Sequence, residues 1–162
     1  MSNLRGMRET EFRETCRALY DDLLAPHLLE GGVRCVKDHQ RQGHRVVIVT
    51  ASIEPVVLPL GEAIGAEATL STRLVASGGV LTGEVELPLC YGPGKLELAT
   101  RWAADNGVEL SESFFYTDSS SDLPLMEAVG HPVAVHPDAR LTRYARQHGW
   151  PITSFRAPVE GP

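Results

Sequence analysis

A run of four β-branched residues, Val46-Val47-Ile48-Val49, constrains the fold more than any other feature of the sequence. A continuous apolar run of this length, bounded by turn residues, is typical of a strand that is buried on both faces and therefore parallel to its neighbours. The residues that follow predict a helix over 53–64, because Ser52 is a good N-cap and Gly65 ends the helix. Pro59 is expected to kink or shorten that helix.

Helical and strand-like segments alternate along the rest of the chain. Amphipathic patterns predict helices over 7–24 and 30–42, and two strand-like runs around Ser77-Gly78-Gly79 predict a hairpin of 68–75 and 80–87. The remaining segments are expected to form helices over 94–106, 122–129 and 138–147, strands over 114–117 and 132–135, and a tail that frays after Phe155. This order predicts an α/β fold with an open, mostly parallel sheet, flanking helices and a small β-hairpin.

Composition limits the kind of protein that this fold serves. The 162 residues suffice for one domain, and a net charge of −6 argues against sequence-independent nucleic-acid binding, which needs a basic surface. No apolar run approaches the roughly 20 residues of a membrane span, and the polar segment 1–11 does not look like a secretory signal. The three cysteines, Cys16, Cys35 and Cys90, are scattered, which favours a reducing compartment. We therefore expect a cytoplasmic protein with no nucleic-acid or membrane partner.

The sharpest candidate site follows the 114–117 strand. Open α/β sheets bind ligands beyond the carboxyl ends of their strands, and Asp118 and Asp122 flank three serines at this point. Carboxylate and hydroxyl oxygens are hard ligands suited to Mg²⁺. The same residues also allow a purely structural explanation, in which Asp118 begins a turn and Asp122 caps the next helix.

Two further segments offer groups that suit a phosphate. The hydroxyl of Thr50 and the backbone N–H groups of Ala51 and Ser52 could hold a phosphate oxygen at a helix N-terminus, although Ser52 could simply be a cap. Lys95 lies at the start of a predicted helix, where a cation opposes the helix dipole. Local helix stability does not require this lysine, so a functional role and a solvated surface role are both open.

Taken together, these segments resemble the haloacid-dehalogenase-like (HAD) superfamily, specifically its phosphoserine-phosphatase-like subfamily IB, which has a Rossmann-like core. Three of the four signature motifs appear in order. They are a hydrophobic strand ending in Ser or Thr (46–52), a lysine at a helix start (Gly94-Lys95), and an acidic pair in a strand-end loop (118–125). The resemblance covers roughly residues 31–155.

The resemblance implies a Mg²⁺-dependent phosphomonoesterase that works through an aspartyl-phosphate on a small phosphorylated metabolite. Thr50 would hydrogen-bond the transferring phosphoryl group, with Ala51 and Ser52 beside it in the phosphate site. Lys95 would neutralise charge on that phosphoryl group. Asp118 would ligate Mg²⁺, and Asp122 would support the metal directly or through water.

The sequence departs from the family at its first motif, Asp-x-Asp-x-Thr, whose first aspartate is the nucleophile. Because that motif is absent, we expect an N-terminally truncated chain in which residues 1–30 are a remnant of a helical cap and 31–162 form a core that lacks its central strand. Such a chain is expected to be inactive as given. The strands ending at Thr50 and Thr117 would then either pair directly or expose unpaired edges that recruit another chain, including a second copy. The alternatives to a phosphatase are a non-catalytic remnant that binds phosphate or Mg²⁺ and a protein-interaction module.

Overall fold

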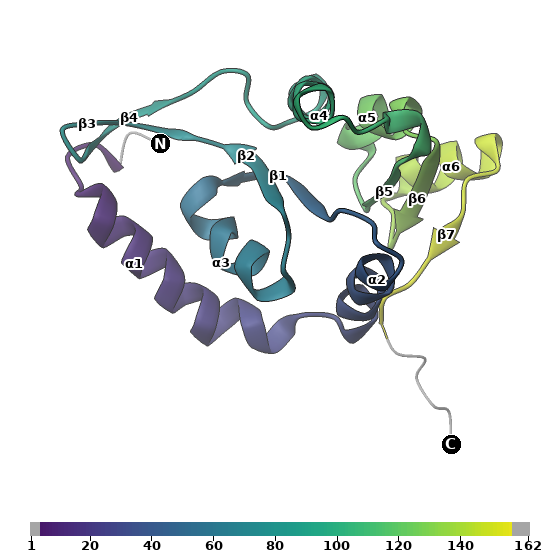
Figure 1. Cartoon of the computed structure of the whole chain (residues 1–162), viewed down its shortest axis with the longest axis horizontal. Coiled ribbons are helices and arrows are strands. Elements are labelled where there is room, and N and C mark those ends of the chain that lie inside the picture. The colour runs from purple at the N-terminus through teal and green to yellow at the C-terminus, as the bar shows by residue number, and fades with distance from the viewer. Residues whose placement is uncertain (1–3, 157–162) are drawn as a thin grey trace. The chain divides into compact units, whose positions relative to one another are not determined.

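The computed structural model describes residues 4–156, which divide into two compact units (Figure 1). The first unit contains residues 4–28 together with Cys35–Cys90. The second unit contains Leu29–Arg34 and the described chain from Tyr91 onward. None of the helices within 4–156 combines the length and the apolar character that crossing a bilayer would require.

The first unit is built around a pair of parallel strands. Its elements are α1 (Glu9–Leu19), a π-helical turn (Tyr20–Leu24), a 3-10 turn (Ala25–His27), most of α2 (Glu30–Arg41), β1 (Val47–Ile53), α3 (Glu54–Ile64), β2 (Ala68–Thr72), β3 (Leu74–Ser77) and β4 (Val80–Val85). Helix α3 packs against both β1 and β2, and α1 packs against α3 (Figure 1). Gly61 allows the close approach of α3 to β2, because a Cβ at this position would lie 2.7 Å from Thr69 Oγ1. The predicted parallel pairing of the β-branched run is confirmed.

Strand β1 continues past the point where the sequence predicted it to end. Thr50, Ala51 and Ser52 all lie within the strand, and Ile53 still pairs with Thr72 of β2 after a register shift. Helix α3 therefore begins at Glu54, with Ile53 as its N-cap residue and no side-chain cap. The prediction that Ser52 caps this helix is wrong, because pairing with β2 keeps the backbone extended through residue 53. The helix also continues through Pro59 rather than ending early.

The predicted hairpin is present but shorter than expected. Strands β3 and β4 pair antiparallel around Gly78 and Gly79, which both adopt positive φ angles. The predicted first strand of the hairpin, 68–75, is in fact two strands interrupted at Arg73. Ala68–Thr72 pairs with β1, and only Leu74–Ser77 belongs to the hairpin. A single run of strand-forming residues thus serves two different sheets.

The second unit contains a three-stranded parallel sheet in the order β5-β6-β7. Its elements are α4 (Pro93–Asn106), a 3-10 turn (Leu110–Glu112), β5 (Phe114–Thr117), a 3-10 turn (Ser120–Asp122), α5 (Leu123–Ala128), β6 (His131–Val135), α6 (Ala139–His148) and β7 (Ile152–Thr153). Strand β7 was not predicted, because two residues carry no periodic pattern. The predicted fraying after Phe155 falls largely on 157–162, outside the described residues.

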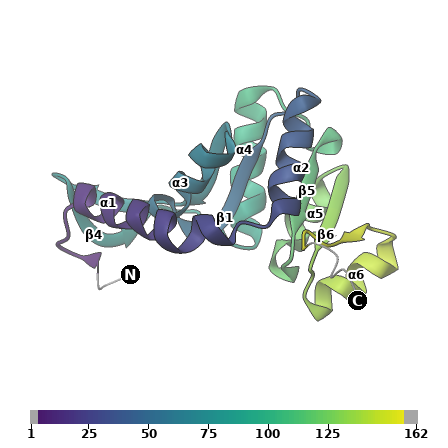
Figure 2. The same cartoon turned by 90° about the horizontal axis from the view of Figure 1, so that it is seen from below.

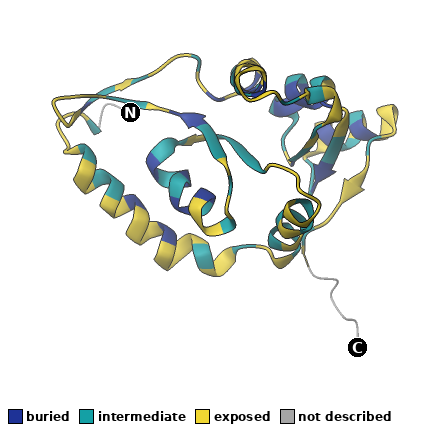
Figure 3. Ribbon diagram, in the orientation of Figure 1, coloured by how far each residue is buried: buried dark blue, intermediate teal, exposed yellow. Residues whose placement is uncertain are grey.

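The core of the second unit lies where α5 and α6 pack against β6 (Figure 2). Its buried members are Leu123, Met126, Ala134, Leu141 and Ala145. Figure 3 shows buried residues in α5, β6 and α6. In α1 of the first unit, by contrast, Cys16 is the one buried residue. The loop that leaves β5 follows directly from this packed sheet.

Strands β1 and β5 belong to different sheets. Within residues 4–156, β1 pairs with β2 alone and β5 pairs with β6 alone. The expectation that the strands ending at Thr50 and Thr117 might pair directly is therefore not met in the described part of the chain.

Candidate functional site

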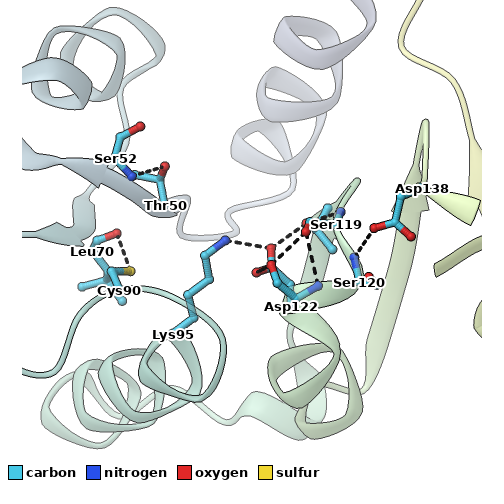
Figure 4. A network of polar contacts seen from close by, with 11 residues as sticks. Thr50, Ser52, Leu70, Cys90, Lys95, Ser119, Ser120, Asp122 and Asp138 are labelled. Carbon is cyan, nitrogen blue, oxygen red and sulfur yellow. Dashed lines mark hydrogen bonds and ion pairs between the residues drawn. The ribbon is translucent and has the colours of Figure 1, made fainter. Parts of the chain in front are cut away.

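The side chain of Lys95 is buried at the start of α4. Its Nζ donates a hydrogen bond to Oδ2 of Asp122 over 2.7 Å, and the two side chains are only 10% and 3% exposed (Figure 4). A lysine at this position does not help the helix dipole, and its burial excludes the solvated surface role that the sequence left open. The lysine instead neutralises a buried carboxylate.

Asp122 is the centre of a small buried network. Its Oδ2 also accepts a hydrogen bond from Thr117 Oγ1 at 2.7 Å, and its Oδ1 accepts one from Ser121 Oγ at 3.3 Å. Asp122 occupies the N-cap position of α5 but makes no side-chain capping hydrogen bond. The structural explanation of Asp122 as a helix cap is therefore wrong. The carboxylate faces Lys95 and Thr117 instead of the helix backbone.

The serine loop between Asp118 and Asp122 is held by hydrogen bonds between residues that are close in sequence. Ser119 Oγ accepts from the N–H of Ser121 at 3.2 Å and lies 2.8 Å from Ser121 Oγ, while the Ser119 N–H donates to Thr117 Oγ1 at 3.3 Å. Asp118, which directly follows β5, is exposed. One carboxylate of the predicted pair is thus buried, and the other is at the surface of the same loop.

Asp138 joins this loop to the start of α6. Its Oδ2 accepts from the N–H of Ser120 (Figure 4) and its Oδ1 from the N–H of Leu141, both at 2.7 Å, and its own N–H donates to the carbonyl of Asp118 at 2.9 Å. The hydrogen bonds that the carboxylate accepts from the backbone N–H groups, first of Leu141 and then of Ser120, hold the pKa of Asp138 below its usual value. The sequence predicted Asp138 as a helix cap, which is confirmed. The link to Ser120 left no signal in the sequence, because it joins residues 18 positions apart.

Thr50 lies on β1 of the first unit. Its Oγ1 accepts a hydrogen bond from the N–H of Ser52 at 3.2 Å (Figure 4). The two other predicted phosphate ligands, Ala51 and Ser52, are exposed and lie in the strand rather than at a helix N-terminus. The predicted site residues therefore form two groups, one on β1 and one around the end of β5.

The oxygen atoms around β5 suit a hard divalent cation. Within 4–156, no cluster of three or more His, Cys, Asp or Glu side chains forms a closed metal cage. Mg²⁺ does not need such a cage, because it keeps several waters and uses one or two carboxylates. The exposed carboxylate of Asp118 and the Oδ1 of Asp122, whose contact with Ser121 is long, are donors of that kind. Thiolate or imidazole ligands, which transition metals favour, are not part of this loop.

Comparison with known proteins decides the family. Residues 2–127 match the family model of haloacid dehalogenase-like hydrolases. The chain belongs to the haloacid dehalogenase-like hydrolase family. The motif resemblance of the sequence is thereby confirmed. Phosphoserine phosphatases occur both among its sequence relatives and among the solved structures that share its α/β fold.

Three similar proteins show how far the likeness extends. An "inhibition of morphological differentiation protein" of Streptomyces azureus is 40% identical over 96% of this chain and 56% of its own length. A histidinol-phosphatase of Neisseria meningitidis is 31% identical over 96% of this chain and 72% of its own length. A solved structure of a Bordetella pertussis protein of unknown function has a TM-score of 0.87 and 30% identity, over 92% of this chain and 68% of that one.

This HAD-family chain spans little more than half the length of several curated relatives that it matches, for example 56% of the Streptomyces protein and 53% of a probable phosphatase of Mycobacterium tuberculosis. The likeness nevertheless runs along almost the whole of this chain, 96% and 95% in the same two comparisons.

Proposed function

We propose that this chain carries the phosphate- and Mg²⁺-binding part of a HAD-type phosphomonoesterase. The observation that best supports this proposal is the buried pair of Lys95 and Asp122 at the carboxyl end of β5. Removing two charges from water costs several kcal/mol per ion, and a helix start gains nothing from a lysine. A fold keeps such a pair most readily where the charges serve chemistry.

Lys95 is proposed to bind the phosphoryl group. An ammonium has three N–H donors, so the hydrogen bond to Asp122 leaves further donors for phosphate oxygens. The hydrogen bond to Asp122 fixes the direction of the Lys95 side chain. Thr50 is proposed to supply a hydroxyl donor to a phosphoryl group, with Ala51 and Ser52 beside it on β1.

Asp118 and Asp122 are proposed to hold Mg²⁺. When bound, the cation would neutralise charge on a phosphate and orient it. Asp118 suits a direct ligand because its side chain is exposed at the end of β5. Asp122 suits a supporting role, directly or through water, because its Oδ2 is already occupied by Lys95 and Thr117.

The catalytic nucleophile is not among the 162 residues given. They contain no Asp-x-Asp sequence, and Asp21-Asp22 lies in a helical turn rather than after a strand. We therefore propose that this chain binds phosphate and Mg²⁺ but does not turn over a phosphomonoester by itself. The segment 1–30 is proposed to belong to a cap and 31–162 to the core.

The proposed ligand is a small phosphorylated metabolite. A histidinol-phosphatase and a phosphoserine phosphatase are relatives of this chain, and the phosphate compounds in both names are monoesters of small amino compounds. The scattered cysteines are consistent with the proposed cytoplasmic location. A second copy that pairs with a strand edge is a proposed partner, and sedimentation over a range of concentrations tests it.

Calorimetry with Mg²⁺ and inorganic phosphate tests the binding proposal, and an assay with a generic phosphomonoester tests the proposed inactivity. We expect heat on adding Mg²⁺ that is lost in Asp118→Asn and retained in Asp105→Asn, a matched change at an exposed position of α4. No heat with the unchanged chain would overturn the binding proposal. Mg²⁺-dependent turnover that is lost in Asp118→Asn would instead overturn the proposed inactivity.

A further inference from the structure

The carboxylate and the backbone N–H of Asp138 make three hydrogen bonds to other residues, and two of these go to the loop after β5 rather than to α6. The Oδ1 atom accepts from Leu141 and thereby caps α6. The Oδ2 atom accepts from the N–H of Ser120 (Figure 4), and the backbone N–H of Asp138 donates to the carbonyl of Asp118. Capping a helix needs only one oxygen, so the second carboxylate oxygen and the backbone contact serve the loop after β5.

The two contacts hold the loop on both sides of Ser119. One fixes the carbonyl of Asp118, and the other fixes the amide of Ser120 at a distance of 2.7 Å. The 3-10 turn that begins at Ser120 carries Asp122 into its buried pair with Lys95. The backbone from which both proposed Mg²⁺ ligands project is therefore anchored to residue 138.

The turn that presents Asp138 is itself held in an unusual conformation. His136 has a φ of 46°, in the left-handed region that costs a non-glycine residue roughly 1–2 kcal/mol. Its backbone N–H donates to the carbonyl of Thr153 at 3.2 Å, and its Nε2 accepts from the N–H of Phe155 at 3.0 Å. Contacts from Thr153 of β7 and from Phe155 thus hold the turn that precedes Asp138.

We infer that Asp138 is a positioning residue for the loop 118–122, which carries the proposed Mg²⁺ ligands. Asp138 holds this loop in the binding conformation through Asp118 and Ser120, without contacting the ion. This inference rests on the proposed Mg²⁺ site. An acceptor for two separate N–H groups requires a carboxylate, because an amide or a hydroxyl in this place offers one acceptor oxygen to two donors that point in different directions.

Asp138→Asn and Asp138→Ser are the informative variants, because asparagine and serine are good helix caps but do not accept from both Ser120 and Leu141. We expect each to weaken Mg²⁺ binding about tenfold or more, as losses of groups that orient a ligand do, with the far-ultraviolet circular dichroism unchanged. The Ser120 amide resonance should also shift without Mg²⁺, since its N–H loses a charged acceptor. The second variant keeps the test decisive if the first one does not fold.

Ala139→Gly is the matched control, because it weakens the exposed first turn of α6 by about 1 kcal/mol without touching the loop. Its Mg²⁺ affinity, measured by calorimetry, should equal that of the unchanged chain. Equal weakening in Ala139→Gly and Asp138→Asn, or unchanged Mg²⁺ affinity in Asp138→Asn, overturns the positioning role and leaves the proposed function intact. An unchanged chain that binds no Mg²⁺ overturns the proposed function, and the positioning role with it.

Discussion

At the scale of single residues, Lys95 occupies an environment that lysine rarely enters, since lysine is almost never fully buried unless it is paired. Its partner Asp122 is 2% exposed, so each charge depends on the other for neutralisation. Breaking a buried pair by removing one member leaves an uncompensated charge. The pair therefore ties the stability of the second unit to the groups proposed for phosphate binding.

Lys95→Met is expected to lower the free energy of unfolding by about 3–5 kcal/mol, because Asp122 is left buried without a cation. Urea denaturation monitored by circular dichroism measures the change. The double variant Lys95→Met/Asp122→Leu should recover most of the loss, since it removes both charges. A single variant as stable as the unchanged chain would show that Asp122 does not depend on Lys95.

His39 predicts a pH dependence. Burial, and after it the neighbouring His44, lower the pKa of His39 below its ordinary 6.5, while Asp38 opposes them. The Nδ1 atoms of the two rings lie 2.8 Å apart, so one of them must carry no proton. Because the unfolded chain protonates His39 more readily than the folded chain does, neutral His39 contributes to stability. This contribution is complete above pH 6.5 and is lost as the pH falls through the lowered pKa of His39.

The free energy of unfolding should therefore be smaller at pH 5.5 than at pH 7.5, and His39→Gln should reduce that difference. Urea denaturation at the two pH values measures it. His27→Gln, at an exposed position in the turn before α2, serves as the matched control and should keep the difference. If His39→Gln leaves the pH dependence of stability as large as before, the histidine pair is not its source.

The sequence indicated the important residues more reliably than their contacts. Lys95 stood out because the helix dipole does not favour it, and Asp118 and Asp122 stood out by their place after a strand. Asp138 was recognised only as a cap, because its second partner, Ser120, is brought near by the pairing of β5 with β6. Such a contact follows from strand register, which no local pattern contains.

At the scale of elements, the sequence predicted whether a segment forms a helix or a strand more reliably than it predicted the residues at which that element begins and ends. The sequence ended the first strand at Val49, because Thr50-Ala51-Ser52 is typical of a helix start. In the structure, pairing of Ile53 with Thr72 extends β1 by several residues. Strand pairing thus outweighed the local preference for a helix cap. As a result, the N–H groups of Ala51 and Ser52 that are proposed to bind phosphate lie on a strand.

Gly130 sets how closely two connecting segments approach, since a Cβ at this position would lie 1.8 Å from the carbonyl oxygen of Ser111. Gly130→Ala is expected to lower the free energy of unfolding by about 3 kcal/mol, because backbone atoms would have to move. Gly107→Ala is the control: its φ of 64° makes alanine unfavourable, but nothing lies within 4 Å. The control should cost about 1–2 kcal/mol in the same urea titration. Equal losses would mean that the close approach to Ser111 is not limiting.

At the scale of the whole molecule, no sheet within residues 4–156 is shared between the units: β1-β2 and β3-β4 lie in the first unit and β5-β6-β7 in the second, and each unit has its own buried residues. The core of the second unit includes Leu141, which is fully buried. Regions with separate cores often open as separate cooperative units in hydrogen exchange. The sequence did not predict this division, because the alternation of strands and helices along the chain predicts a single open sheet.

Leu141→Ala is expected to lower the stability of the second unit by about 2–5 kcal/mol through the cavity that it leaves. Hydrogen exchange should show faster exchange in β5 and β6, whereas β1 and β2 keep their protection. Equal acceleration in both sheets would show that the two units open together.

Neither unit is a continuous stretch of chain, and this has a consequence for cleavage. The connection Leu87–Tyr91 carries exposed side chains that chymotrypsin accepts, with Leu89 44% and Tyr91 61% exposed, so chymotrypsin should cut first after Tyr91. The two fragments would not be independent pieces, because Leu29–Arg34 belongs with the second unit, where a Cβ on Gly31 would lie only 2.5 Å from the Phe155 carbonyl oxygen. A nicked molecule is thus expected to migrate as one species in gel filtration and to separate only in denaturant.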